Sequence, residues 1–150
     1  MLARFAVALV LGIILGVERE LAGKEAGVRT EMLVAGGAAL FAMVGIILPY
    51  LVAPAAADLP DIIARNSGFL AVIANVVVGI GFLGAGLIIK TGDRSHGLTT
   101  AALVWMTAAI GILAGLGLFQ FSLTVTIITA VALFFLRKTN VSERLEKNQV

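Results

Sequence analysis

The sequence predicts an all-α membrane protein, a polytopic bundle of about five transmembrane helices. The first observation is composition: the 150 residues are 60% hydrophobic and 13% charged, whereas soluble domains carry about 25% charged residues. The second is the length of five apolar runs, each near the roughly 20 residues that cross a bilayer as a helix. The third is the distribution of Lys and Arg between alternate connections, which is uneven.

With five spans, nine of the eleven Lys and Arg residues lie on one side of the membrane, in 18–31, 90–97 and the tail after the last helix. Only Arg4 and Arg65 lie on the other side. Because cytoplasmic connections collect Lys and Arg, we expect the N-terminus outside and the C-terminus in the cytoplasm. One transmembrane domain over residues 1–137 and a short polar tail over 138–150 are expected.

The first helix is expected over Leu2–Val17. No small-residue cleavage site precedes the charges that follow, so we interpret this run as a membrane span and not as a signal peptide. Small residues recur in it every four positions and end on a carboxylate, which predicts one helix face for close packing. These residues are Ala8, Gly12, Gly16 and Glu20.

Residues 18–31 are predicted to form an irregular loop that holds seven of the twenty charged residues. They are Glu18, Arg19, Glu20, Lys24, Glu25, Arg29 and Glu31. Carboxylates suit a hydrated magnesium ion, so Glu18, Glu20 and Glu31 are weak metal candidates. An interfacial salt-bridge network and a protein contact are the alternatives. No cofactor is expected apart from weak binding of Mg²⁺.

The second helix is expected over Met32–Val52 and is followed by the longest connection, 53–66. All three prolines lie at the end of this helix or beyond it. A short surface helix is predicted over Leu59–Ala64, with Pro60 in its first turn.

The third helix, expected over Ser67–Ile89, contains four glycines in eight residues: Gly79, Gly81, Gly84 and Gly86. A dinucleotide loop would need a preceding strand and a polar turn, and neither is predicted here. On a helical wheel, Gly79 and Gly86 share a face with Asn75, and Gly81 and Gly84 lie opposite. This arrangement predicts a packing hub with close neighbours on two sides.

Asn75 is the only side-chain amide within these spans apart from Gln120, near the start of the last helix. It could join this helix to a neighbour by a hydrogen bond, or line a polar path through the bundle. No carboxylate lies in the middle of a predicted span, which weakens a transporter interpretation because coupled transport normally needs such a group.

The connection Lys90–Gly97 is short and polar. Ser95 and His96 follow Asp93 closely, but a catalytic triad is a spatial arrangement with an oxyanion hole, not a loop segment. The absence of cysteine also excludes thiolate catalysis. We therefore predict that the protein is not an enzyme.

The fourth helix is expected over Leu98–Gly117, with a threonine as N-cap. It carries a second series of small residues at four-residue spacing: Thr107, Gly111 and Gly115. The fifth helix, Phe119–Leu136, contains no glycine and many large apolar side chains. We expect it on the lipid-facing periphery.

Several blocks of the sequence together resemble the MgtC/SapB family of bacterial inner-membrane proteins. The blocks are Gly16-x-Glu18-Arg19-Glu20, Ala26-Gly27-Val28-Arg29-Thr30, the glycine-rich stretch Gly79–Gly86, Gly97-Leu98-Thr99-Thr100-Ala101-Ala102 with Trp105, and Ala109-Ile110-Gly111. The resemblance covers most of the chain. By position, Glu18, Arg19, Glu20, Arg29, the four glycines, Thr99, Thr100 and Trp105 match the family motifs.

The resemblance implies a five-helix domain without enzymatic activity that regulates magnesium, ion or energy homeostasis, in adaptation to low magnesium and in virulence or acid survival. It implies contacts with membrane partners such as ATP synthase. The alternative is a magnesium or other cation transporter or channel. The chain differs from many members at Glu31, where histidine is common, and at Asn75, where glutamine is usual. The cytoplasmic domain that many members carry after the fifth helix is not expected.

We therefore expect a multi-pass protein of the bacterial inner membrane that contacts lipid and does not bind nucleic acid. The glycine-lined faces also make a homodimer one option.

Overall fold

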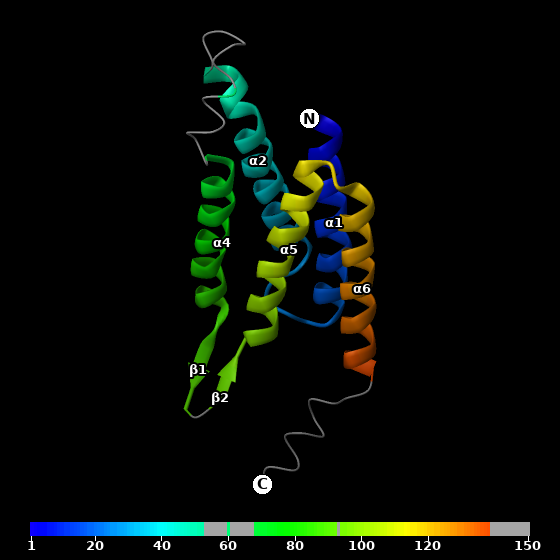
Figure 1. The fold of residues 1–150 in the computed structure, drawn as a ribbon. Coiled ribbons are helices and arrows are strands. Elements are labelled where there is room, and N and C mark those ends of the chain that lie inside the picture. Colours follow the sequence, from blue (N-terminus) through cyan, green and yellow to red (C-terminus); the bar gives the residue numbers. More distant parts are fainter. Residues whose placement is uncertain (53–59, 61–67, 93, 139–150) are drawn as a thin grey trace.

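The computed structural model describes residues 1–52, 60, 68–92 and 94–138, which form five long helices and one small hairpin (Figure 1). The helices are α1 (Leu2–Leu21), α2 (Val28–Val52), α4 (Gly68–Leu87), α5 (Leu98–Leu116) and α6 (Phe119–Lys138). The predicted five-helix, nearly all-α fold is confirmed. The predicted surface helix Leu59–Ala64, apart from Pro60, and the tail after Lys138 lie outside the described residues.

Three of these helices are long and apolar enough to cross a membrane: Val28–Leu51 within α2, Leu98–Leu116 and Phe119–Lys138. The apolar part of α4, Ala71–Leu87, is shorter, and α1 carries charged residues near both ends. The chain is therefore a membrane protein by these helices. Five spans, and the orientation of the chain, remain predictions.

The predicted loop 18–31 is wrong at both ends. Helix α1 continues through Glu18, Arg19 and Glu20 to Leu21, because Glu, Arg and Leu are all good helix formers. Helix α2 already begins at Val28. Only residues 22–27 connect the two helices, and the last charged residues of the predicted loop belong to the first turn of α2.

Helix α5 is the centre of the bundle, since it contacts α1, α2, α4 and α6. Figure 1 shows it beside α2, with α1 and α6 on one side and α4 on the other. Its chain direction is the same as that of α2, whereas α1, α4 and α6 run the opposite way.

Both predicted series of small residues bring backbones together. A Cβ atom at Gly16 would lie 2.5 Å from Cα of Val28, and one at Gly115 would lie 2.6 Å from the carbonyl oxygen of Ala39. A Cβ atom at Gly111 would lie closer still to the carbonyl oxygen of Ala35. Helix α2 therefore packs tightly against α1 on one side and α5 on the other, which only small residues permit.

The prediction that the glycine-rich helix is the packing hub is wrong for this chain by itself. At Gly79, Gly81 and Gly86 of α4, no atom of the described residues lies within 4 Å of an added Cβ. Only Gly84 is buried, beside Ala101 of α5. The positions with close backbone neighbours lie on α1, α2 and α5 instead.

The connection from α4 to α5 is a two-stranded antiparallel hairpin, which the sequence reasoning missed. Strand β1 (Ile89–Thr91) pairs with β2 (Arg94–His96), with Lys90 opposite Ser95. The third helix therefore ends at Leu87, earlier than predicted. Gly-Asp between two strand-forming segments favours a two-residue hairpin turn, and this was the overlooked signal.

Both ends of α5 are glycine caps. The N-cap is Gly97, with φ of 82°, and no side-chain cap is present, so the predicted threonine N-cap is wrong. At the other end, Gly117 N donates to Ala114 O and Leu118 N donates to Leu113 O, which is a Schellman motif. Arg4 Nη1 of α1 donates to Gly115 O at 3.1 Å.

Helix α6 lies at the periphery, as predicted. Its buried residues are Ser122 and Thr126, and their hydroxyls donate to backbone carbonyls of α6 itself. The large apolar side chains are mostly exposed, among them Ile128, Phe134 and Phe135. Exposed apolar surface on a long apolar helix fits contact with lipid.

Candidate functional site

Two regions of the structure bring predicted site residues together. One is a polar cluster where the end of α1 meets the start of α2 and the part of α5 from Leu98 to Thr107. It is made of Glu18, Arg19, Glu20, Glu25, Glu31, Thr100 and Thr107. The other is a groove between α2 and α4 that includes Asn75 and Gly79.

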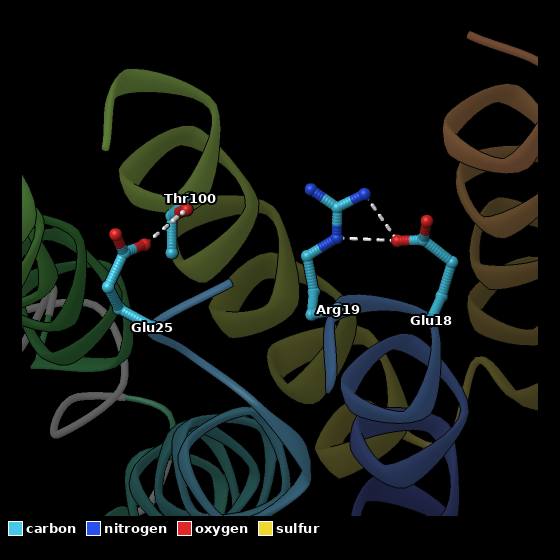
Figure 2. A network of polar contacts seen from close by, with 4 residues as sticks. All are labelled: Glu18, Arg19, Glu25 and Thr100. Carbon is cyan, nitrogen blue, oxygen red and sulfur yellow. Dashed lines mark hydrogen bonds and ion pairs between the residues drawn. The ribbon is translucent and has the colours of Figure 1, made fainter. Parts of the chain in front are cut away.

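Arg19 is a buried cation at the end of α1. Its Nε and Nη2 atoms both donate to Glu18 Oε2 (Figure 2). Glu18 Oε1 is buried and has no hydrogen-bond partner among the described residues. A buried charge without a partner is strongly destabilising, and Glu18 provides the partner of Arg19.

Glu20 and Glu25 connect helices. Glu20 Oε2 accepts a hydrogen bond from Val28 N at 3.0 Å, which satisfies one of the free N–H groups at the start of α2. Glu25 Oε2 accepts from Thr100 Oγ1 at 3.4 Å, so the connection between α1 and α2 reaches the start of α5. Figure 2 shows that the Glu25 pair and the Glu18 pair are separate.

Glu31 is fully buried in the first turn of α2. Arg19 and the Thr107 hydroxyl are the groups that act on its carboxylate. Neither reaches hydrogen-bond geometry, so both Glu31 oxygens and Thr107 Oγ1 have no partner within the described structure. A buried carboxylate without a hydrogen bond is unusual and calls for a structural or functional explanation.

The three weak metal candidates are not gathered into one site. Glu18 pairs with Arg19, Glu20 caps α2, and Glu31 is enclosed between helices. The residues that the structure describes contain no group of three or more His, Cys, Asp or Glu side chains that could hold a metal ion. The structure therefore gives the magnesium interpretation of this cluster no ligand set.

The groove between α2 and α4 has a volume of about 580 Å³. Leu33, Gly37 and Phe41 line its α2 side, and Asn75 and Gly79 lie on its α4 side. Its walls are almost entirely apolar, and Asn75 is exposed there. Asn75 and Gly79 are thus on one face, as the helical wheel predicted, and that face is open within this chain.

The remaining motif positions divide by exposure. Arg29, Thr99 and Trp105 are exposed, and Trp105 keeps 48% of its surface accessible. Thr100 is buried beside Glu25. The motif residues are therefore not one catalytic centre, and only some of them lie in the polar cluster.

The juxtaposition of Glu31 and Thr107 was not among the sequence predictions, although two matching series of residues indicate it. Thr107, Gly111 and Gly115 on α5 have the same four-residue spacing as Glu31, Ala35 and Ala39 on α2. The contacts of Gly111 with Ala35 and of Gly115 with Ala39 put the two series side by side. One turn earlier on both helices, Thr107 faces Glu31.

Comparisons with known proteins agree with this architecture. A family model described as the MgtC family matches residues 5–141. The chain belongs to the MgtC family. It is 43% identical over 131 residues to Protein MgtC of Salmonella typhimurium, covering 87% of this chain and 50% of that protein.

Two further relatives are similar to this chain over most of its length. Protein SrpB of Synechococcus elongatus is 37% identical over 138 residues, with 87% of this chain and 71% of that protein covered. Protein MgtC of Brucella abortus is 38% identical over 125 residues, with 83% and 46% covered. The chain spans about half the length of the two MgtC proteins. No solved structure gives a significant match.

The MgtC membership confirms the predicted resemblance to this family.

Proposed function

We propose that this MgtC family protein is a non-enzymatic regulator of ion or energy homeostasis in the bacterial inner membrane, acting through helix contacts with a membrane partner such as ATP synthase. The observation that carries the proposal is the open α2–α4 groove. Gly37 and Gly79 have nothing within 4 Å of an added Cβ, so the backbone of another helix can approach closely there.

Asn75 adds a polar reason for a partner at the same groove. Its side chain is exposed on a helix whose surroundings are apolar. An amide in lipid gains about 1 kcal/mol or somewhat more when it finds an interhelical hydrogen bond. A partner helix that supplies a donor or acceptor at this depth would therefore bind in preference to lipid.

The test is Gly79→Leu, which fills the groove, with Val78→Leu as control because Val78 is 74% exposed on α4 and does not line the groove. Tagged chains are purified from native membranes and probed for ATP synthase subunits. We expect Gly79→Leu to reduce the recovered ATP synthase about tenfold or more, equivalent to about 1.4 kcal/mol, and Val78→Leu to leave it unchanged. Equal recovery with both variants would refute the groove as the contact.

The transporter alternative is separated by flux measurements on the purified chain in liposomes. The groove is lined by apolar residues apart from Asn75, which favours a contact surface over an ion path. We expect no magnesium or proton flux above that of empty liposomes. Flux that disappears in Glu20→Gln would instead support the transporter.

A further inference from the structure

The surroundings of Glu31 leave its carboxylate without a hydrogen bond. The side chain has no exposed surface, and its two oxygens and Thr107 Oγ1 all lack hydrogen-bond partners within the described residues. An ionised carboxylate without a partner is strongly destabilising in such a place. Because Thr107 lies opposite Glu31 across the α2–α5 contact, a hydrogen bond between the carboxyl group and this hydroxyl would satisfy one oxygen atom of each residue.

The place is enclosed by three helices. On the α1 side, Gly12 is so close that an added Cβ would lie 2.5 Å from the backbone carbonyl oxygen of Glu31. On the α5 side, the contacts of Gly111 and Gly115 with α2 fix the register that brings Thr107 opposite Glu31. The carboxylate therefore cannot turn to solvent without separating packed backbones.

The nearby charges leave one negative charge in excess. Arg19 is the charged group that acts on Glu31, but two of its donors are already engaged with Glu18. Glu18 and Arg19 neutralise each other, so Glu31 remains. One additional positive charge would make the group of Glu18, Arg19 and Glu31 neutral.

A metal ion does not fit this place well. The hollows of about 580, 400 and 230 Å³ on the described residues are not lined by Glu31 or Thr107. Calcium takes six to eight oxygen ligands, and magnesium requires near-ideal octahedral geometry. The side chains here offer one carboxylate and one hydroxyl, beside a guanidinium that repels cations. A proton needs neither volume nor further ligands.

We propose that the Glu31 carboxyl group is a proton-binding site inside the bundle, with Thr107 Oγ1 as the acceptor of its hydrogen bond. The proton adds to one carboxylate oxygen, and the new O–H donates to Thr107 Oγ1 while Arg19 stays on Glu18. When the proton leaves, the Glu31 carboxylate competes with Glu18 for Arg19. Proton binding is thereby coupled to the contact between α1 and α2.

The test is infrared difference spectroscopy of the full chain in lipid nanodiscs at neutral pH. The C=O stretch of a protonated carboxyl group is separate from the bands of ionised carboxylates. We expect this band in the wild type, its loss in Glu31→Gln, and its retention in the control Glu25→Gln, because Glu25 is exposed. Absence of the band in the wild type would overturn the proposal.

Two further measurements test the assigned hydrogen-bond acceptor and distinguish a proton from a metal cation. Thr107→Val conserves shape and removes the acceptor, so we expect the band to remain but to shift, even if Glu31→Gln does not fold. A band with the same frequency in Thr107→Val would overturn the assigned acceptor. Replacing choline chloride by sodium or magnesium chloride should leave the band unchanged. Loss of the band on that exchange would show that a metal cation occupies the site and would overturn the proton assignment.

Discussion

At the scale of single residues, charged side chains in this protein form hydrogen bonds with backbone groups at helix ends. Glu20 accepts from the first N–H of α2, and Arg4 donates to Gly115 O near the end of α5. Each bond satisfies a backbone group that a helix end leaves without a partner. Such side chains therefore contribute to the structure of the helix ends and are not merely solvated surface.

Gly111 tests how closely the central helices approach. We expect Gly111→Ala to destabilise the protein by about 1–3 kcal/mol, because the new methyl group would overlap the Ala35 carbonyl and overpack the contact. The matched control is Gly79→Ala on α4, where the added Cβ meets nothing within 4 Å. Thermal unfolding in detergent measures both. A Gly111→Ala protein as stable as the control would contradict the close α2–α5 contact.

At the scale of elements, helix ends depend on capping groups that apolar runs do not reveal. The run over Leu2–Val17 predicted α1, but the helix continues through charged residues because Glu20 supports the start of α2 while Arg19 is buried against Glu18. Existence of the five helices could be predicted from hydropathy alone. Their ends depend on which side chains meet across helices, and that information is tertiary.

The same limit explains the error over the packing hub. A glycine on a helix permits close approach of another helix, but its position in the sequence does not predict which helix packs against it. Helix α2 packs against Gly111 and Gly115 of α5, whereas Gly79 and Gly81 of α4 have no such neighbour in the described chain. Likewise, Glu31 was recognised as a charged motif residue, but its burial against Thr107 required the register between two helices.

Substitution of Gly97 tests the contact between the end of α4 and the start of α5. Its φ of 82° is unfavourable for other residues, and an added Cβ would overlap the carbonyl of Leu87 at the end of α4. The control Gly92→Ala has a similar φ of 61° but nothing within 4 Å. We expect Gly92→Ala to cost about 1–2 kcal/mol for backbone strain alone, and Gly97→Ala to cost clearly more. Equal loss of thermal stability in the two variants would mean that α4 and α5 do not meet at this joint.

At the scale of the whole molecule, the fold has two ends of different chemistry. The connection between α1 and α2, the hairpin and the end of α6 lie at one end, and the start of α1 and the turn from α5 to α6 lie at the other (Figure 1). Exposed cations such as Lys24, Lys90 and Arg137 lie at the first end. Lys and Arg at one end favour its position in the cytoplasm.

This orientation can be measured with single cysteines, because the chain has none of its own. Lys24→Cys and Ser95→Cys place an exposed thiol at the polar end, and Leu118→Cys places one in the turn between α5 and α6. With a membrane-impermeant maleimide applied to spheroplasts, we expect labelling at position 118 only. In inverted vesicles we expect the reverse, labelling at 24 and 95 only. Positions 24 and 95 must be labelled in the same preparation, because the structure places both at one end. Labelling of one in spheroplasts and of the other in inverted vesicles would contradict the arrangement of the helices. Labelling of both in spheroplasts, with position 118 labelled only in inverted vesicles, would contradict only the predicted orientation.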